Sequence, residues 1–210
     1  MARTGQETEV KFHVRCLSAL PARIEALGGR LLMPRTHESN LRFDTPDEAL
    51  GRDGRALRLR RDATCHLTFK GQSRWVDGVR IRDEFETTVA DLSSSASILH
   101  ALGYVVVFEY EKYRAVYELA DTEVMLDELP FGDFVEIEGG LDAIRPAAEQ
   151  LGLNWTAAIA DSYHSLFERL QVAADLPFRD LTFSNFEGRS ERAVDVGVVP
   201  ADDGFSAPGS

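Results

Sequence analysis

The feature that most constrains the fold of this chain is an alternation of charged and apolar residues in one short run after another. At the start of the chain, Glu7, Glu9 and Lys11 alternate with Val10 and Phe12. Side chains at i, i+2 and i+4 of a strand point to the same side of a sheet, so such a run has one ionic and one apolar face. Further strand-like runs occupy residues 40–44, 56–61, 66–71, 79–87, 105–111, 112–119, 123–129 and 134–139.

Four amphipathic helices are expected between and after these runs. The first follows Ser18, a candidate N-cap, and stops at Gly28. Two more end at Leu102 and Leu151, each followed by glycine. A fourth, over 156–170, would place Ile159, Tyr163, Leu166 and Leu170 on one face. Many strands with a few interspersed helices predict an α+β fold built on an antiparallel sheet or a closed barrel.

Composition limits the domains and the partners. The chain has 210 residues, 44% of them hydrophobic, which is enough for one sizeable core. We expect one domain over 1–172 and a partly flexible C-terminal tail over 173–210, with a packed segment near 176–186. With 23 basic and 35 acidic residues and a net charge of −12, neither nucleic acid nor membrane is an expected partner. No run reaches the roughly 18 apolar residues of a spanning helix. Two cysteines are too few for a disulfide framework and the N-terminus is charged, so a cytoplasmic protein is expected, either a monomer or a homodimer.

The expected strands present an unusually charged face. Its side chains are Glu7, Glu9, Lys11, Arg58, Arg60, His66, Lys70, Arg80, Arg82, Glu84, Glu86, Lys112, Arg114, Asp127, Glu136 and Glu138. One interpretation is a sheet whose charged face meets water. The other is a barrel with this face inside, which is costly to desolvate unless a polyphosphate and a divalent cation neutralise it. Arginine and lysine bind phosphate oxygens and carboxylates bind Mg²⁺ or Mn²⁺, so the second interpretation is favoured.

Several short motifs occur in the order found in a known family. Residues 7–11 have the form E-x-E-x-K, and they are followed by FDTPD at 43–47, ALRLR at 56–60, TFKG at 68–71, RDEFE at 82–86, EKYR at 111–114, DE at 127–128 and EIEG at 136–139. Ser162-Tyr163 is similar to the start of that family's closing helix. The chain thus resembles, over about residues 5–170, the CYTH or triphosphate tunnel metalloenzyme family. That family includes class IV adenylate cyclases, thiamine triphosphatases and inorganic triphosphatases.

The resemblance implies an eight-stranded antiparallel β-barrel, a tunnel with a charged lumen and helices packed outside. It implies that the triphosphate is bound by Lys11, Arg58, Arg60, Lys70, Arg82, Lys112 and Arg114, with Arg80 a weaker match. It implies that Mg²⁺ or Mn²⁺ is held by Glu7, Glu9, Glu136 and Glu138. Lys11, Lys70 and Asp127 would be catalytic, Asp127 either as a further metal ligand or by orienting a basic residue. Glu84 and Glu86 lie near the metal or pair with arginines.

Three functions remain open. The first is metal-dependent hydrolysis of inorganic or small organic triphosphate. The second is a class IV-type adenylate cyclase that converts ATP to cyclic AMP and pyrophosphate, and the third is a non-catalytic polyphosphate-binding module. Some family hydrolases use a tyrosine soon after the first motif, and thiamine triphosphatases use a C-terminal lysine. This chain has no tyrosine before Tyr104 and no lysine after Lys112, which leaves water activation to the metal and disfavours thiamine triphosphate.

A few conspicuous residues are not expected to carry chemistry. His13 and His66 share the charged face but are interpreted as hydrogen-bonded wall residues. Cys16 and Cys65 lack the partners of a nucleophile or a zinc site. Trp75 falls in a probable turn over 73–78, where it is either an exposed loop aromatic or a lid contact.

Overall fold

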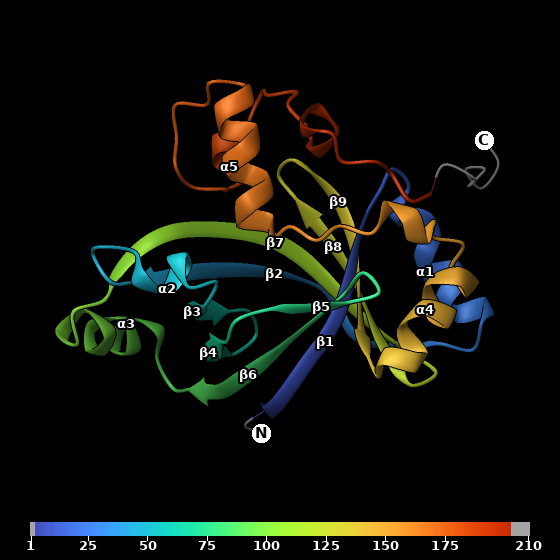
Figure 1. Ribbon diagram of the computed structural model, residues 1–210, viewed down its shortest axis with the longest axis horizontal. Coiled ribbons are helices and arrows are strands. Elements are labelled where there is room, and N and C mark those ends of the chain that lie inside the picture. The colour runs from blue at the N-terminus through green and yellow to red at the C-terminus, as the bar shows by residue number, and fades with distance from the viewer. Residues whose placement is uncertain (1–2, 203–210) are drawn as a thin grey trace.

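The computed structural model describes residues 3–202, which form a closed barrel of eight antiparallel strands with helices outside it (Figure 1). The barrel strands are β1 (Arg3–Val14), β2 (Arg30–Asp44), β3 (Ala56–Arg61), β4 (Cys65–Lys70), β6 (Val79–Val89), β7 (Val105–Leu119), β8 (Thr122–Leu129) and β9 (Gly132–Gly139). Their order is β1-β9-β8-β7-β2-β3-β4-β6, and pairing of β1 with β6 closes the ring. The α+β class and the eight-stranded barrel are therefore confirmed.

The ring closes because β1 exchanges one neighbour for another along its length. It pairs with β6 up to Glu9, which lies opposite Arg80, and with β9 from Glu9 onward, where Glu138 is the partner. A short strand, β5 (Arg74–Val76), pairs with β6 through a tight hairpin. Its turn, Asp77 and Gly78, has positive φ at both residues, as two-residue hairpins favour. Trp75 therefore lies in a strand next to the turn and not in the turn itself.

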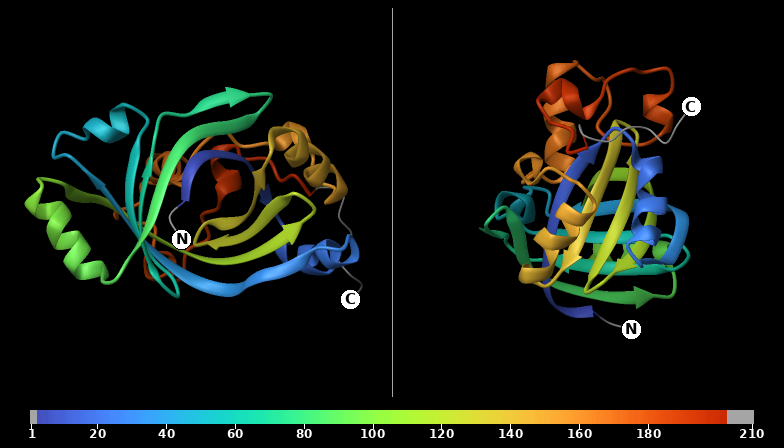
Figure 2. Two further views of the ribbon diagram at one scale, coloured as in Figure 1. Left: turned by 90° about the horizontal axis from the view of Figure 1, so that it is seen from below. Right: turned by 90° about the vertical axis from the view of Figure 1, so that its right-hand side faces the viewer.

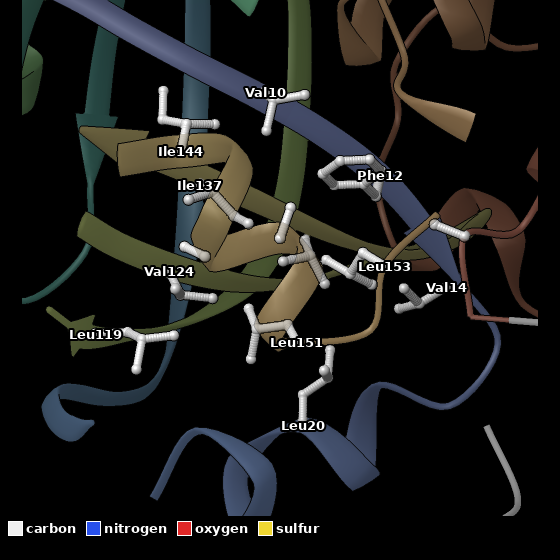
Figure 3. Packing of buried hydrophobic residues seen from close by; sticks show 14 of the residues in the cluster. Val10, Phe12, Val14, Leu20, Leu119, Val124, Ile137, Ile144, Leu151 and Leu153 are labelled. Atoms are coloured by element: carbon white, nitrogen blue, oxygen red, sulfur yellow. The ribbon is translucent and has the colours of Figure 1, made fainter. Parts of the chain in front are cut away.

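Helices cover the outer, apolar face of the barrel in three groups. The helical elements are η1 (Leu17–Ala19), α1 (Leu20–Ala26), α2 (Ala49–Arg52), α3 (Leu92–Ala101), α4 (Leu141–Gln150), η2 (Trp155–Ala157), α5 (Tyr163–Ala173), η3 (Ser184–Phe186) and η4 (Ala193–Val196). α1 and α4 lie at the end opposite α2 and α3, and α5 lies across β7 (Figures 1 and 2). Figure 3 shows the largest cluster, in which Val10 and Phe12 of β1 pack with Ile144 of α4 and Leu20 of α1.

Several expected boundaries are wrong for local reasons. β2 begins at Arg30, about ten residues before the expected run, because register shifts near Met33 interrupt the period of two. The runs at 105–111 and 112–119 are one strand, β7, since it pairs with β2 along its length and gains β8 only from Tyr113. Ser18 does not cap the first α-helix, which starts at Leu20. α5 starts at Tyr163 with Ser162 as N-cap, so Ile159 is extended instead, and its N–H donates to the carbonyl of Lys11.

The segment after α5 runs along the outside of the barrel. Leu181 exchanges backbone hydrogen bonds with Glu109 and Glu111 of β7. Farther on, the N–H of Ala193 donates to Phe131 in the β8–β9 hairpin, and that of Ala201 donates to His13 of β1. Leu176, Leu181 and Phe186 are buried in a cluster with α5. Residues 203–210 of the expected tail lie outside the described residues. Within 3–202, no helix combines the length and the apolarity needed to cross a bilayer.

Leu181→Ala tests how strongly this segment contributes to stability. Leu181 is fully buried, so we expect the free energy of unfolding to fall by about 2–5 kcal/mol in denaturant titrations. Val172→Ala is the control because Val172, near the end of α5, is 84% exposed and its truncation should change stability by less than about 0.5 kcal/mol. Equal, small effects for the two variants would contradict the packing described.

Candidate active site

The barrel encloses a cavity of about 450 Å³ whose walls carry mostly charged side chains. Basic residues reach it from β1, β2, β3, β4, β6 and β7, and acidic residues from β1, β6, β8 and β9. The charged face read from strand parity therefore points inward. Burial would make so many charges costly if they were unpaired, and nearly all of them are paired.

The first group of pairs lies where β1 meets β6. The carboxylate of Glu7 accepts from Lys70 at 2.6 Å and from Arg82. Glu9 pairs with Arg80 and lies 3.8 Å from Arg82. Burial alone would raise the pKa of Glu7, but the two cations facing it hold that pKa below its ordinary value. Glu7 is thus ionised and joins two of the predicted triphosphate ligands.

The second group lies across β7, β8 and β9. Asp127, fully buried, accepts from Lys112 at 3.0 Å and from two nitrogens of Arg114 at 2.6 Å. The hydroxyl of Tyr163 donates to the same carboxylate at 2.9 Å. Glu136 pairs with Arg114 and, at 3.1 Å, with Lys11. Against the effect of burial, these cations hold the pKa of Glu136 well below its usual range.

The third group joins β3, β4 and β6 around Glu86. Its carboxylate accepts from Thr68 at 2.7 Å and lies 3.5 Å from Arg60 and 3.8 Å from Arg58. His66 also contacts it, at 3.3 Å. Burial raises the pKa of Glu86, but Arg60 and Arg58 outweigh it, so the net direction is downward. The sequence left two roles open for Glu86, proximity to the metal or pairing with arginines, and the structure shows it beside two arginines.

The structure brings together most of the residues that the sequence singled out. Those that line the cavity are Glu7, Glu9, Lys11, Arg58, Arg60, Lys70, Arg82, Lys112, Arg114, Glu136 and Glu138, together with Arg80, Glu84, Glu86 and His66. Asp127 lies behind this lining, beneath Lys112 and Arg114. His13 is outside the cavity, where its Nδ1 bonds the carbonyl of Asp133 at 2.8 Å. Cys16 and Cys65 form no disulfide.

Sequence reasoning missed the inward face of β2 and two tyrosines. Glu38, Asn40 and Arg42 alternate with Ser39, Leu41 and Phe43, the same period of two that identified the other strands. The signal was therefore present, but only residues 40–44 were assigned to a strand and their faces were not separated. Tyr110 of β7 and Tyr163 of α5 line the cavity as well. No local pattern distinguishes Tyr163 from the apolar face of its helix.

Glu38 is the most enclosed of these additions. Its side chain is fully buried, and neither carboxylate oxygen has a hydrogen-bond partner among the described residues. Lys112 lies 3.6 Å away and Arg60 3.7 Å away. Burial raises the pKa of Glu38, but Lys112, Arg114, Arg60 and Arg58 together lower it to about 2. The negative charge of Glu38 therefore interacts with four of the basic residues predicted to bind the triphosphate.

The predicted metal ligands are placed on neighbouring strands. Glu9 of β1 lies opposite Glu138 of β9, and Lys11 lies opposite Glu136. Carboxylate oxygens are the donors that Mg²⁺ and Mn²⁺ prefer, so the donor chemistry fits. Glu7, Glu9 and Glu136 form ion pairs with lysine or arginine side chains. Within residues 3–202, no three acidic, histidine or cysteine side chains lie close enough together to hold a metal ion.

Comparison with known proteins places the chain in a family. Adenylate cyclase CyaB of Aeromonas hydrophila is 26% identical over 175 residues, which span 78% of this chain and 89% of that protein. A putative adenylate cyclase from Vibrio parahaemolyticus has the same fold, with a TM-score of 0.71 at 22% identity over 78% of this chain and 99% of its own. A putative adenylyl cyclase from Hippeastrum, described as having a dominant triphosphatase activity, gives a TM-score of 0.58 at 22% identity over 77% and 95% of the two chains.

The family model for the CYTH domain matches residues 5–149, which include every barrel strand except the first two residues of β1. The match and the inward-facing charges agree, since the charged motifs of the sequence lie on strands that line the cavity; the motif at residues 43–47, which runs from the end of β2 into a turn, is the exception. The chain belongs to the CYTH domain family.

Proposed function

We propose that this protein is a divalent-metal-dependent enzyme that binds a triphosphate in the barrel cavity and hydrolyses it. The observation that carries the proposal is the convergence of basic side chains from six strands on one cavity that is also lined by carboxylates. A polyanion accompanied by a cation matches both signs of charge. A single anion or a neutral ligand would leave most of these groups without a role.

The basic residues would bind and polarise the substrate. Arginine presents a planar fork to two phosphate oxygens, and lysine acts as a point charge. Arg58, Arg60 and Arg82 supply forks from β3 and β6, while Lys11, Lys70 and Lys112 supply ammonium groups. Positive charge placed beside the bridging oxygen stabilises the negative charge that develops there as the P–O bond breaks. Lys11 and Lys70 are proposed to act in this way.

The carboxylates would hold the metal. Glu7, Glu9, Glu136 and Glu138 are the proposed ligands for Mg²⁺ or Mn²⁺, by exchanging arginine and lysine partners for the ion. When bound, such an ion neutralises phosphate charge and lowers the pKa of a coordinated water. The internal ion pairs would keep these carboxylates ionised and in place before the ion and the substrate arrive.

Asp127 is proposed to act as a positioning residue and not as a metal ligand. Its two oxygens already accept from Lys112, Arg114 and Tyr163, and it lies behind the cavity lining. The ring of Tyr163 lies 4.2 Å from the ammonium of Lys11, so the same tyrosine contacts both a buried anion and a lumen cation. Together these contacts orient Lys11, Lys112 and Arg114 toward the substrate.

Cyclisation of ATP is the second candidate, supported by the name of the Aeromonas hydrophila relative. The same basic residues would then hold the β and γ phosphates as the leaving pyrophosphate, while the ribose 3′-hydroxyl attacks the α phosphorus. The two reactions differ in which phosphorus is attacked and by which oxygen.

Product analysis distinguishes these functions. The purified protein is incubated with inorganic triphosphate and, separately, with ATP, each with Mg²⁺ or Mn²⁺, and the products are resolved by chromatography. We expect orthophosphate, released fastest from the inorganic substrate and without cyclic AMP. Cyclic AMP with pyrophosphate would instead establish the cyclase, and binding without turnover under either metal would establish a non-catalytic module.

Lys70→Ala tests the proposed triphosphate clamp. Removing the ammonium should lower turnover by about 10²–10³-fold, because charge that develops on the phosphate loses a preorganised partner. The fold should persist, since Glu7 keeps Arg82 as a partner. Arg145→Ala, on the exposed face of α4, is the control and should leave turnover unchanged. Near-normal activity of Lys70→Ala on both substrates would place the chemistry outside this cavity.

Glu38→Gln tests how much the buried negative charge of Glu38 stabilises the fold, through the pH dependence of the free energy of unfolding. The pKa of Glu38 falls from 4.5 to about 2 on folding, so its ionisation stabilises the fold above pH 4.5, and this stabilisation is lost as pH falls toward 2. At pH 7 we expect the variant to be less stable by about 3 kcal/mol in denaturant titrations. The difference should shrink between pH 4.5 and pH 3.

The control for Glu38 is Glu128→Gln, which removes a carboxylate from an exposed pair with Arg35. That variant should change stability by less than about 1 kcal/mol. A difference between Glu38→Gln and the unsubstituted protein that stays constant down to pH 3 would show that packing, and not charge, explains the effect.

A further inference from the structure

Arg42 of β2 differs from every other basic residue of the cavity within the described chain. Lysine and arginine side chains that line the cavity and have a carboxylate oxygen within 4.0 Å are Lys11, Arg58, Arg60, Lys70, Arg80, Arg82, Lys112 and Arg114. Arg42 lines the same cavity but forms no ion pair with any residue in 3–202. Its Nε is buried and has no hydrogen-bond partner there, as is also true of Arg58, Arg60 and Arg80, but each of those three has a carboxylate within ion-pair distance.

The neighbours of Arg42 do not compensate its charge. Across the sheet it lies opposite Arg58 on one side and Phe108 on the other. His164 of α5 lines the cavity too, its ring centroid 4.3 Å from that of Phe108. Burial, and then the charge of Arg42, lower the pKa of His164 to about 4, so the imidazole is neutral at pH 7. Burial also lowers the pKa of Arg42 itself.

After burial, the groups that act most on the pKa of Arg42 are the phenol of Tyr110 and then the carboxylates of Asp44 and Glu168, all of which raise it. Tyr110 already accepts a hydrogen bond from Arg58. Neither carboxylate is within ion-pair distance of the Arg42 guanidinium. Asp44 is also committed elsewhere, because its oxygens accept from the backbone N–H groups of Thr45, Leu50 and Gly51 around the start of α2. The positive charge of Arg42 is therefore largely uncompensated inside the protein.

This arrangement favours an anion from outside. A half-buried cation without an ion-pair partner destabilises the fold, and like charges directly opposite each other on neighbouring strands add to that cost. A phosphate between Arg42 and Arg58 would relieve both effects, because a guanidinium fork fits two phosphate oxygens. Arg42 could make that contact without giving up an internal ion pair, which the eight paired cations cannot do.

We propose that Arg42 is a substrate-binding residue that holds one phosphate group of the triphosphate together with Arg58. This inference rests on the proposed function, and it adds a residue of β2 to the binding site. It implies that Arg42 lowers the stability of the ligand-free protein and raises its affinity for triphosphate. A residue with a purely structural role would not have opposite effects on the two.

The test compares Arg42→Gln with Arg60→Gln, and with Arg145→Gln as a control for the loss of one positive charge outside the cavity. Binding of inorganic triphosphate is measured by calorimetry without a divalent metal, and thermal unfolding is measured without ligand. For Arg42→Gln we expect the dissociation constant to rise about 10- to 100-fold, the effect of a lost hydrogen bond to a charged group. Its unfolding temperature should stay the same or rise.

For Arg60→Gln, which loses contacts with Glu38, Asp62 and Glu86, both affinity and unfolding temperature should fall. Arg42→Lys, which keeps the charge but not the fork, should bind with intermediate affinity. If Arg42→Gln binds within about threefold of the unsubstituted protein while Arg60→Gln binds weakly, the inference is wrong and the proposed function stands. If the unsubstituted protein binds triphosphate neither without a metal nor with Mg²⁺ present, both are overturned.

Discussion

The pairing of charges inside the barrel is the interaction on which the rest of this structure depends. Strand parity places lysine, arginine and glutamate side chains in a closed interior, where the cost of desolvation is large. Glu7, Glu38, Glu86, Asp127 and Glu136 each face at least two cations, so almost no charge is left alone. The cavity can therefore stay open and polar without unfolding the barrel. The apolar core lies outside the ring, between strands and helices.

Closure of the ring makes this pairing possible. β1 reaches β6 with one half and β9 with the other, and Glu9 lies at the exchange, opposite both Arg80 and Glu138. Residues from the two ends of the barrel domain are thereby brought into one ionic network. The segment after α5 adds backbone contacts to β7 and to β1, the two strands that flank the β8–β9 hairpin, and α5 carries Tyr163 into the cavity wall.

The same ion pairs explain how a site for a polyanion can exist before its ligand binds. When a paired lysine or arginine binds a phosphate, its ion pair with a carboxylate must weaken. The carboxylate released in this way becomes a potential ligand for a cation. Substrate and metal would thus be coupled through shared partners such as Glu7 and Glu136. Arg42 is the exception, and its unpaired charge is consistent with a direct role in attracting the anion.

The sequence by itself determined which side chains share a face, because the period of two in a strand is local. It also determined the apolar outer face, the α+β class and, through its ordered motifs, the resemblance to the CYTH family. It did not determine that β2 extends back to Arg30, since bulges interrupt the period there, nor that Ile159 is extended. Only the tertiary structure decided which charges pair, that Asp127 lies behind Lys112 and Arg114, and that Arg42 has no ion-pair partner among residues 3–202. Those facts depend on contacts between strands far apart in the chain, which side-chain alternation within one strand cannot specify.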